Sequence, residues 1–188
     1  MNQGIRIGKN ILHQRDKKVT GSQLIIENET FYKISNNDAM RPFFMSIVSD
    51  SNHWMFLSSN GGLTAGRKNS EFALFPYYTD DKITESIEVT GSKTIMRVKT
   101  GDGEVLWEPF SDRYEGIYQL TRNLYKNTFV NKVIFEEVNE DLGLVFRYQW
   151  SSSNVYGFVK RASLQNTNES DVEVSLLDGL QNIVPHGV

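Results

Sequence analysis

The stretch from Leu144 to Trp150 alternates between two kinds of side chain. Leu144, Phe146 and Tyr148 occupy every second position, and the positions between them include Arg147 and Gln149. Because successive side chains of a strand point to opposite faces, this pattern predicts a sheet with one buried face. Roughly ten to thirteen stretches of the chain read as strands, and none keeps a sustained helical period. The sequence therefore predicts an all-β fold in which two antiparallel sheets pack face to face.

The clearest local prediction is a hairpin in the middle of the chain. Residues Ile83 to Thr90 and Lys93 to Thr100 both read as strands, and Gly91-Ser92 between them fits a two-residue turn with glycine first. Gly101-Asp102-Gly103-Glu104 then reads as a second hairpin turn, because it lacks the further ligand spacing of a calcium or phosphate loop. We expect this region to be a meander without a helix.

Composition excludes several classes of function. The chain of 188 residues has no cysteine, which removes disulfides, thiolate chemistry and cysteine-ligated metal. Its net charge of −3 offers no general attraction for nucleic acid, and no apolar run is long enough for a membrane helix. We expect a cytoplasmic protein that uses no cofactor. Secretion or a periplasmic location stays open, because a signal peptide could have been removed.

The chain divides into a polar extension, residues 1–21, and a β-sandwich domain, residues 22–188. The sequence stops shortly after a strong strand at residues 172–180, so we expect the chain to be the N-terminal fragment of a larger protein. A face of the sandwich left without its neighbour would then be exposed.

The stretch from Ser58 to Ile83 is dense in glycine, aromatic and charged residues, which favours a shaped binding loop over a linker. We expect Arg67 to pair with Asp80 or Asp81, because a guanidinium binds a carboxylate well. The candidates for carbohydrate binding or for an interface are Arg67, Tyr77, Tyr78, Asp80, Asp81, Lys82 and Trp150. The alternative reading of the large aromatic residues, which include Trp107 and Tyr156, is that they fill the core.

No residue is assigned a catalytic or metal-binding role. His13, His53 and His186 are far apart and have no metal-ligand spacing. Glycoside hydrolysis needs two carboxylates across a sugar bond, but Glu136 and Glu137 are adjacent on a predicted strand and should point to opposite faces.

Four segments, NGGLTAGR, ALFPYYTDDKI, FRYQWSSS and LLDGLQNIVP, together resemble the N-terminal β-sandwich of proteins related to cellobiose and chitobiose phosphorylases. That domain is a galactose-mutarotase-like super-sandwich, which a fragment would leave incomplete. The resemblance implies a C-terminal (α/α)6 domain that carries the catalytic acid and the phosphate site, and this chain contains neither. It further implies carbohydrate, that catalytic domain and a second copy of the protein as partners, with no nucleic acid and no membrane.

The favoured function is therefore a non-catalytic sandwich of a glycoside phosphorylase or hydrolase, which serves packing, assembly and carbohydrate contact. Two alternatives stay open. One is a free-standing sugar-active enzyme of the aldose-epimerase type that uses a carboxylate base and a histidine acid, for which His53 and His186 are the candidate histidines. The other is a protein-interaction domain that binds no sugar.

Overall fold

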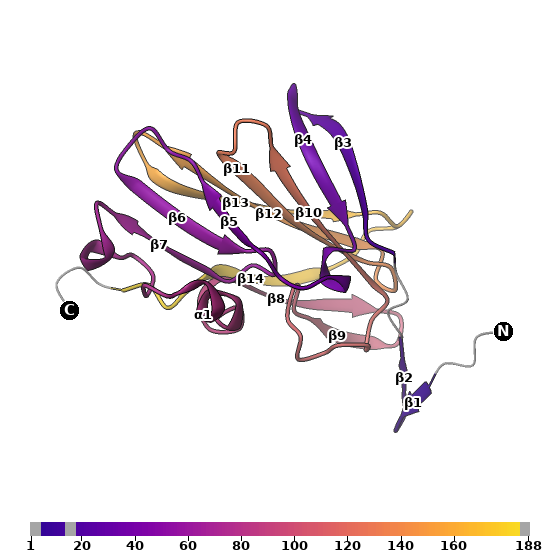
Figure 1. Ribbon diagram of the computed structural model, residues 1–188. Coiled ribbons are helices and arrows are strands. Elements are labelled where there is room, and N and C mark those ends of the chain that lie inside the picture. Colours follow the sequence, from indigo (N-terminus) through magenta and orange to yellow (C-terminus); the bar gives the residue numbers. More distant parts are fainter. Residues whose placement is uncertain (1–4, 14–17, 185–188) are drawn as a thin grey trace.

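The structure, a computed structural model, describes residues 5–13 and 18–184 (Figure 1). These residues form four antiparallel sheets and very little helix. The strands are β1 (Ile5–Ile7), β2 (Asn10–Leu12), β3 (Thr20–Ile26), β4 (Glu29–Ser35), β5 (Phe44–Ile47), β6 (His53–Ser58), β7 (Leu63–Arg67), β8 (Gly91–Thr100), β9 (Gly103–Trp107), β10 (Leu120–Asn127), β11 (Lys132–Asn139), β12 (Leu144–Ser153), β13 (Gly157–Asn166) and β14 (Val174–Gln181). The helical segments are α1 (Asp80–Glu85) and two single 3-10 turns, η1 (Asn37–Ala39) and η2 (Ser70–Phe72).

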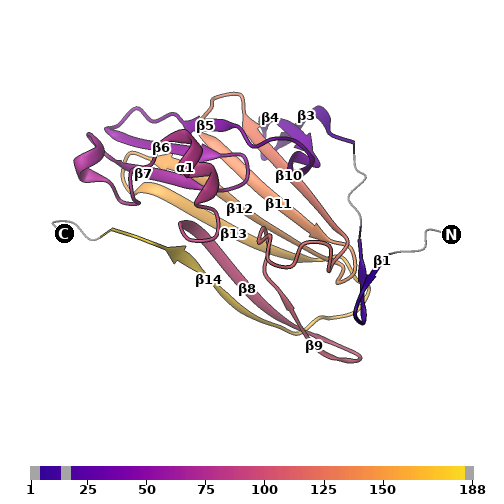
Figure 2. The same ribbon diagram turned by 60° about the horizontal axis from the view of Figure 1, so that its bottom comes forward.

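The fold is an all-β sandwich, as the alternating sequence pattern predicts. One layer is a six-stranded sheet in the order β13-β12-β11-β10-β4-β3. Two three-stranded sheets, β5-β6-β7 and β14-β8-β9, make up the second layer and lie on the same side of the large sheet (Figure 2). The hairpin β1-β2 stands apart and belongs to the segment that we assigned to the polar extension. The second layer is thus split, and its two halves meet over the large sheet.

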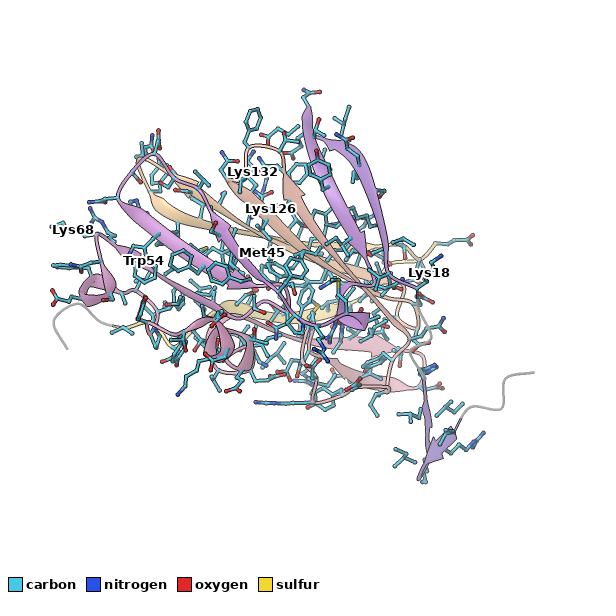
Figure 3. All side chains as sticks on the ribbon, in the orientation of Figure 1. Lys18, Met45, Trp54, Lys68, Lys126 and Lys132 are labelled. Atoms are coloured by element: carbon cyan, nitrogen blue, oxygen red, sulfur yellow. The ribbon has the colours of Figure 1, made fainter. Side chains whose placement is uncertain are left out.

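The core fills the space between the two layers. Its buried side chains come from all three sheets of the sandwich, and Met45 of β5 is one of them (Figure 3). In the large sheet, Leu124, Phe135 and Tyr148 lie side by side across β10, β11 and β12 and face this core. The rings of Phe135 and Tyr148 stack with their centroids 4.8 Å apart. Register and burial together confirm the predicted period of two.

The predicted hairpin between Ile83–Thr90 and Lys93–Thr100 is wrong. Residues 80–85 form α1, turns follow, and β8 begins only at Gly91 and pairs with β9 and β14. Two acidic residues in the first turn suit the positive end of a helix. Ile83 is the one buried residue of α1, and its carbonyl accepts a hydrogen bond from the Ser86 hydroxyl at 2.8 Å. A tertiary contact with the second layer therefore selects a helix where the local pattern indicates a strand.

The contact between α1 and the second layer depends on Gly62. A Cβ atom added to Gly62 would lie 1.9 Å from the carbonyl oxygen of Ile83. We expect Gly62→Ala to destabilise the fold by about 1–3 kcal/mol, the usual cost of overpacking, because the clash is with backbone that cannot rotate away. Urea unfolding of the variant and the parent protein measures this difference.

Gly101 provides the matched control, since a Cβ atom there would meet nothing within 4 Å. Gly101→Ala should leave the unfolding midpoint nearly unchanged. Equal effects of the two substitutions would contradict a specific role for the approach of Gly62 to α1.

Candidate functional site

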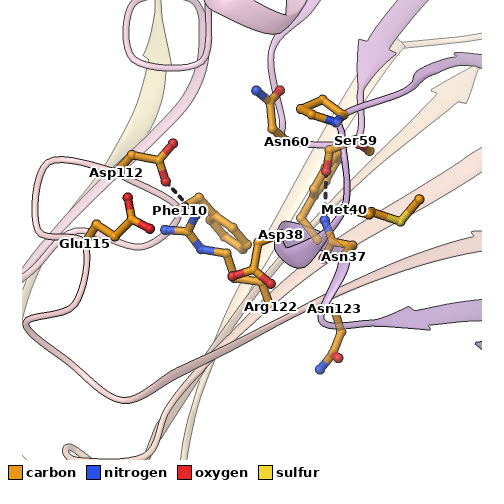
Figure 4. Close-up of a pocket in the computed structure, with 12 residues that line it drawn as sticks. Asn37, Asp38, Met40, Ser59, Asn60, Phe110, Asp112, Glu115, Arg122 and Asn123 are labelled. Carbon is orange, nitrogen blue, oxygen red and sulfur yellow. Dashed lines mark hydrogen bonds and ion pairs between the residues drawn. The ribbon is translucent and has the colours of Figure 1, made fainter. Parts of the chain in front are cut away.

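A polar cleft opens between the two layers at the edge where η1 meets β10 (Figure 4). Its cavity volume is about 220 Å³. We call it the inter-sheet cleft. The wall combines carboxylates, amides, a guanidinium and two aromatic rings: Asn37, Asp38, Asn60, Phe110, Asp112, Glu115, Arg122 and Phe135. The first three come from η1 and from the turn after β6, so the fold brings distant segments together here.

Arg122 is the central cation of the inter-sheet cleft. It lies on the inner face of β10, directly across from Glu137 of β11, and both residues are buried. Its Nε donates to Glu137 at 2.7 Å, one Nη donates to Asp112 at 2.8 Å, and the other Nη donates to the Ser111 carbonyl at 2.9 Å. Burial acts to lower the pKa of Arg122, but the charges of Glu137 and Asp112 outweigh it and raise the pKa. The guanidinium is therefore always charged and fixed in position.

Glu137 links the large sheet to the loop after β9. Its side chain is completely buried and accepts hydrogen bonds from Trp107 Nε1 at 2.8 Å and from the backbone N–H of Phe110 at 2.9 Å. Phe110 has φ of +64°, which is an unfavourable backbone conformation for a bulky residue. Such strain persists where the surrounding structure enforces it, and it is common at binding sites. The buried carboxylate thus holds a strained aromatic residue at the cleft wall.

Glu88 fixes the next part of the same loop. Its carboxylate accepts hydrogen bonds from the Ser111 hydroxyl at 2.8 Å and from the Asp112 N–H at 2.9 Å, and it pairs with Lys93 at 2.9 Å. Burial acts to raise the pKa of Glu88, but the bonds from Lys93, Ser111 and Asp112 outweigh it and lower the pKa. The position of Asp112 in the cleft wall therefore depends on an ionised Glu88.

Asn37 gives the cleft an acceptor that has no partner. The residue is only 8% exposed, and its Nδ2 donates to the Ser59 carbonyl at 3.0 Å. Its Oδ1 is buried and accepts no hydrogen bond from any described residue. Buried polar atoms in folded proteins are nearly always paired. An unpaired one in a cleft wall is therefore a position where a ligand that carries an O–H or N–H group would gain a bond.

The cleft has the chemistry of a binding site for hydroxylated molecules. Carboxylate and amide oxygens accept from hydroxyl groups, a guanidinium donates to hydroxyl oxygens, and aromatic faces cover the C–H surface of a sugar ring. No histidine lines the cleft among the described residues. Within residues 5–13 and 18–184, no group of three or more acidic residues or histidines is placed to hold a metal ion.

None of the seven sequence-predicted candidates lines the inter-sheet cleft. Asp80, Asp81 and Lys82 are exposed in the first turn of α1, and Tyr78 is half-buried in the segment before it. Trp150 is a core residue, 1% exposed, with its ring edge-on to Phe75. The alternative reading of the aromatic residues is thus right for Trp150.

The predicted pairing of Arg67 with Asp80 or Asp81 is wrong. No ion pair joins Arg67 to either described carboxylate, and Asp81 instead accepts a hydrogen bond from the Thr79 hydroxyl at 2.5 Å. Arg67 is exposed at the last position of β7, whereas α1 packs beside Gly62 at the start of that strand. A strand rises by about 3.3 Å per residue, so Arg67 lies several residues along β7 from the contact with α1.

Tyr77 belongs to a surface feature that the sequence did not reveal as a unit. It is 59% exposed, and its ring lies edge-on to Trp54 with centroids 5.8 Å apart. Trp54 stacks on Phe56 at 5.7 Å, and Phe56 lies 5.3 Å from Phe44. These four side chains form an aromatic row on the outer face of β5-β6-β7, where Figure 3 labels Trp54.

Sequence reasoning missed the cleft residues because they come from strands, a 3-10 turn and loops that are far apart in the sequence. One signal was available, since Glu136 and Glu137 interrupt the apolar strand Val133 to Val138. The expectation that the two point to opposite faces is confirmed: Glu137 faces the core, and Glu136 bonds to Tyr125 and Asn123 on the outer face. A charged residue on the inner face of a strand needs a buried partner, and that requirement points to Arg122.

No protein-family model matches the chain, and no curated protein sequence matches it. No helix among the described residues has the length and apolar character that crossing a bilayer requires.

The Arg122–Glu137 pair should be critical for stability. We expect Glu137→Gln to lower the free energy of unfolding by about 3–5 kcal/mol, because it leaves a buried guanidinium without its main counter-charge. Glu104→Gln is the matched control, since Glu104 pairs with Arg97 at the surface, and its loss should cost less than about 1 kcal/mol. Urea unfolding of both variants tests the difference, and similar costs would contradict the importance of the buried pair.

The pKa of Glu88 predicts how stability depends on pH. A carboxylate whose pKa is lower in the folded state stabilises the protein above its unfolded pKa, and this contribution is lost as the pH falls through the folded value. For Glu88 the loss should begin below the ordinary value of 4.5. Thermal unfolding across this range should show a smaller acid-induced fall in Tm for Glu88→Gln than for the parent protein. If Tm falls with pH to the same extent in Glu88→Gln and in the parent protein, Glu88 makes no pH-dependent contribution to stability.

Proposed function

We propose that this chain is a non-catalytic β-sandwich of a larger carbohydrate-active enzyme, of the glycoside phosphorylase or hydrolase type, and that its inter-sheet cleft contacts carbohydrate. One observation carries the proposal. A cleft with an unpaired buried Asn37 oxygen lies against a fixed guanidinium and a strained Phe110. Such a wall offers hydrogen bonds and an aromatic surface at once, which a sugar uses and an apolar ligand does not.

The resemblance of the sequence to phosphorylase-type sandwiches supports the same assignment. In that setting the catalytic chemistry belongs to an (α/α)6 domain, and the sandwich contributes packing, assembly and sugar contact. A cytoplasmic location and a galactose-mutarotase-like topology are parts of this proposal.

The positions of the histidines favour this function over an aldose epimerase. Epimerase chemistry needs an acid and a base beside the sugar. His53 lies away from the cleft, where its Nδ1 is 2.6 Å from the Ser51 hydroxyl and its ring packs edge-on to Phe158. The Nε2 atom of His13 lies 3.9 Å from Oδ2 of Asp141, and neither residue lines the cleft. The other candidate, His186, lies outside the described residues.

The proposal predicts sugar binding without turnover. Cellobiose and N,N′-diacetylchitobiose titrated into the purified chain should bind, as measured by calorimetry and saturation-transfer NMR, and neither should be hydrolysed or phosphorolysed. Asp112→Asn keeps the shape of the cleft wall but removes a charged acceptor. It should weaken binding about tenfold, which corresponds to about 1.4 kcal/mol.

Two control variants make the binding experiment specific. Asp102→Asn alters an exposed carboxylate in the turn before β9, outside the cleft, and should leave binding unchanged. Tyr77→Ala alters the aromatic row. Loss of binding in Tyr77→Ala with full binding in Asp112→Asn would move the sugar site to that row, and no binding of either disaccharide would refute the proposed function.

A further inference from the structure

The most exposed regular element of the sandwich is β14. Six consecutive residues of this strand, 175–180, are exposed. Three of them are leucines: Leu176 is 52% exposed, Leu177 is 68% exposed and Leu180 is 39% exposed. Isolated apolar residues on a surface need no explanation. An exposed apolar strand at the edge of a sheet does need one, because its free backbone groups can pair with another strand.

The backbone of β14 has one open edge. β14 pairs with β8 on one side only, and in Figure 2 it forms the outer border of its sheet. The hydrogen bond from Lys99 N to Glu173 O, 3.0 Å, shows which residues of the segment point toward β8. Hydrogen-bonded positions alternate along an antiparallel strand. Leu176, Asp178 and Leu180 therefore direct their N–H and C=O groups to the open side.

Within the described chain, the edge strand β3 of the large sheet is also open, but the edges of β5, β7, β9 and β13 are covered or blocked. β5 is covered where Val48 N bonds to the Val130 carbonyl at 2.9 Å and Lys126 Nζ bonds to the Ser46 carbonyl at 3.0 Å. On β7, the backbone N–H groups of Leu74 and Phe75 bond to the Ala65 carbonyl. β9 accepts the Tyr118 hydroxyl at its Leu106 carbonyl, and β13 carries the adjacent charges Lys160 and Arg161.

β14 has little of this protection: Lys160 Nζ donates to the Gly179 carbonyl at 3.3 Å, but the alternation places that carbonyl on the side of β8. It contains no proline, lysine or arginine, the residues with which proteins commonly block edge pairing. Its one charged residue, Asp178, accepts hydrogen bonds from the Thr94 hydroxyl at 2.6 Å and from Lys160 Nζ at 2.7 Å. The edge is therefore open to a further strand.

We propose that β14 pairs antiparallel with β14 of a second copy of this chain. The residues are self-complementary about Asp178, since Leu176 and Leu180 lie two positions on either side of it. With Asp178 opposite Asp178 of the second copy, each Leu176 faces a Leu180 across the strands. Leu177 then meets Gly179 of the second copy, and a side chain fits there because nothing lies within 4 Å of the Cβ position of Gly179.

The charges at the centre of this interface are complementary. Each Asp178 is paired with the Lys160 of its own chain, so the twofold axis brings together two acids and two amines rather than two unpaired acids. Like charges directly opposite each other destabilise a strand pair, and the two lysines remove that repulsion. The result is one continuous six-stranded sheet across the two copies, with an isologous contact. The proposed contact lies outside the inter-sheet cleft, which is lined by other residues.

Sedimentation equilibrium of the purified chain tests the proposal. The protein should be a dimer, and the double variant Leu176→Lys/Leu180→Lys should be monomeric, because lysines on both sides of the axis repel and cannot pack. Ile25→Lys is the matched control, since Ile25 on the edge strand β3 is 74% exposed, and this variant should stay dimeric. Far-UV circular dichroism confirms that the variants are folded.

A cross-linking experiment tests the register independently. The chain has no cysteine, so introduced thiols are the only ones present. Mild oxidation of a mixture of Leu177→Cys and Gly179→Cys chains should give mainly the mixed disulfide dimer, because these two positions face each other. A parent protein that is monomeric at all concentrations, a lysine double variant that still dimerises, or mixed disulfides no more abundant than the like pairs would overturn the proposal.

Discussion

The rest of the structure depends on the buried ion pair between Arg122 and Glu137. Two charges taken out of water are costly unless the remaining donors and acceptors are also satisfied. Here Trp107 and the backbone N–H of Phe110 donate hydrogen bonds to the Glu137 carboxylate. The Ser111 carbonyl and the Asp112 carboxylate accept the remaining hydrogen bonds of the guanidinium. The pair therefore holds the large sheet and the loop after β9 in one arrangement, because any other would leave a charge unpaired in the core.

The same ion pair that stabilises the fold also positions the wall of the candidate binding site. The loop that Glu137 and Glu88 hold is also one wall of the inter-sheet cleft. Its strained residue, Phe110, keeps φ of +64° because the carboxylate accepts its N–H. A cleft built in this way is already formed before a ligand arrives, which limits the entropy that binding has to overcome. The polar groups at its wall are correspondingly rigid, and they favour a ligand with matching hydroxyl positions.

Sequence reasoning succeeded where a pattern is local and failed where a partner is distant. The alternation in Leu144 to Trp150 predicted the sheet, and adjacency predicted the opposite directions of Glu136 and Glu137. The region around Ile83 misled, because its apolar spacing fits a short helix as well as a strand. The predicted pairing of Arg67 failed because α1 contacts the chain beside the start of β7, whereas Arg67 is at the end of that strand. The cleft could not be predicted, since its residues come from strands and loops that are distant in the sequence.

The sequence by itself determined the class of the fold, because a period of two requires pleated strands with one buried face. It also excluded cysteine chemistry. Only the tertiary structure decided which buried charges meet, which strands and loops line the inter-sheet cleft, and which strand edges stay open. The physical reason is that burial and pairing are properties of contacts between distant segments. Leu177 lies in a strand that the sequence predicts, yet its side chain is 68% exposed, and the strand has a neighbour on one side only among the described residues.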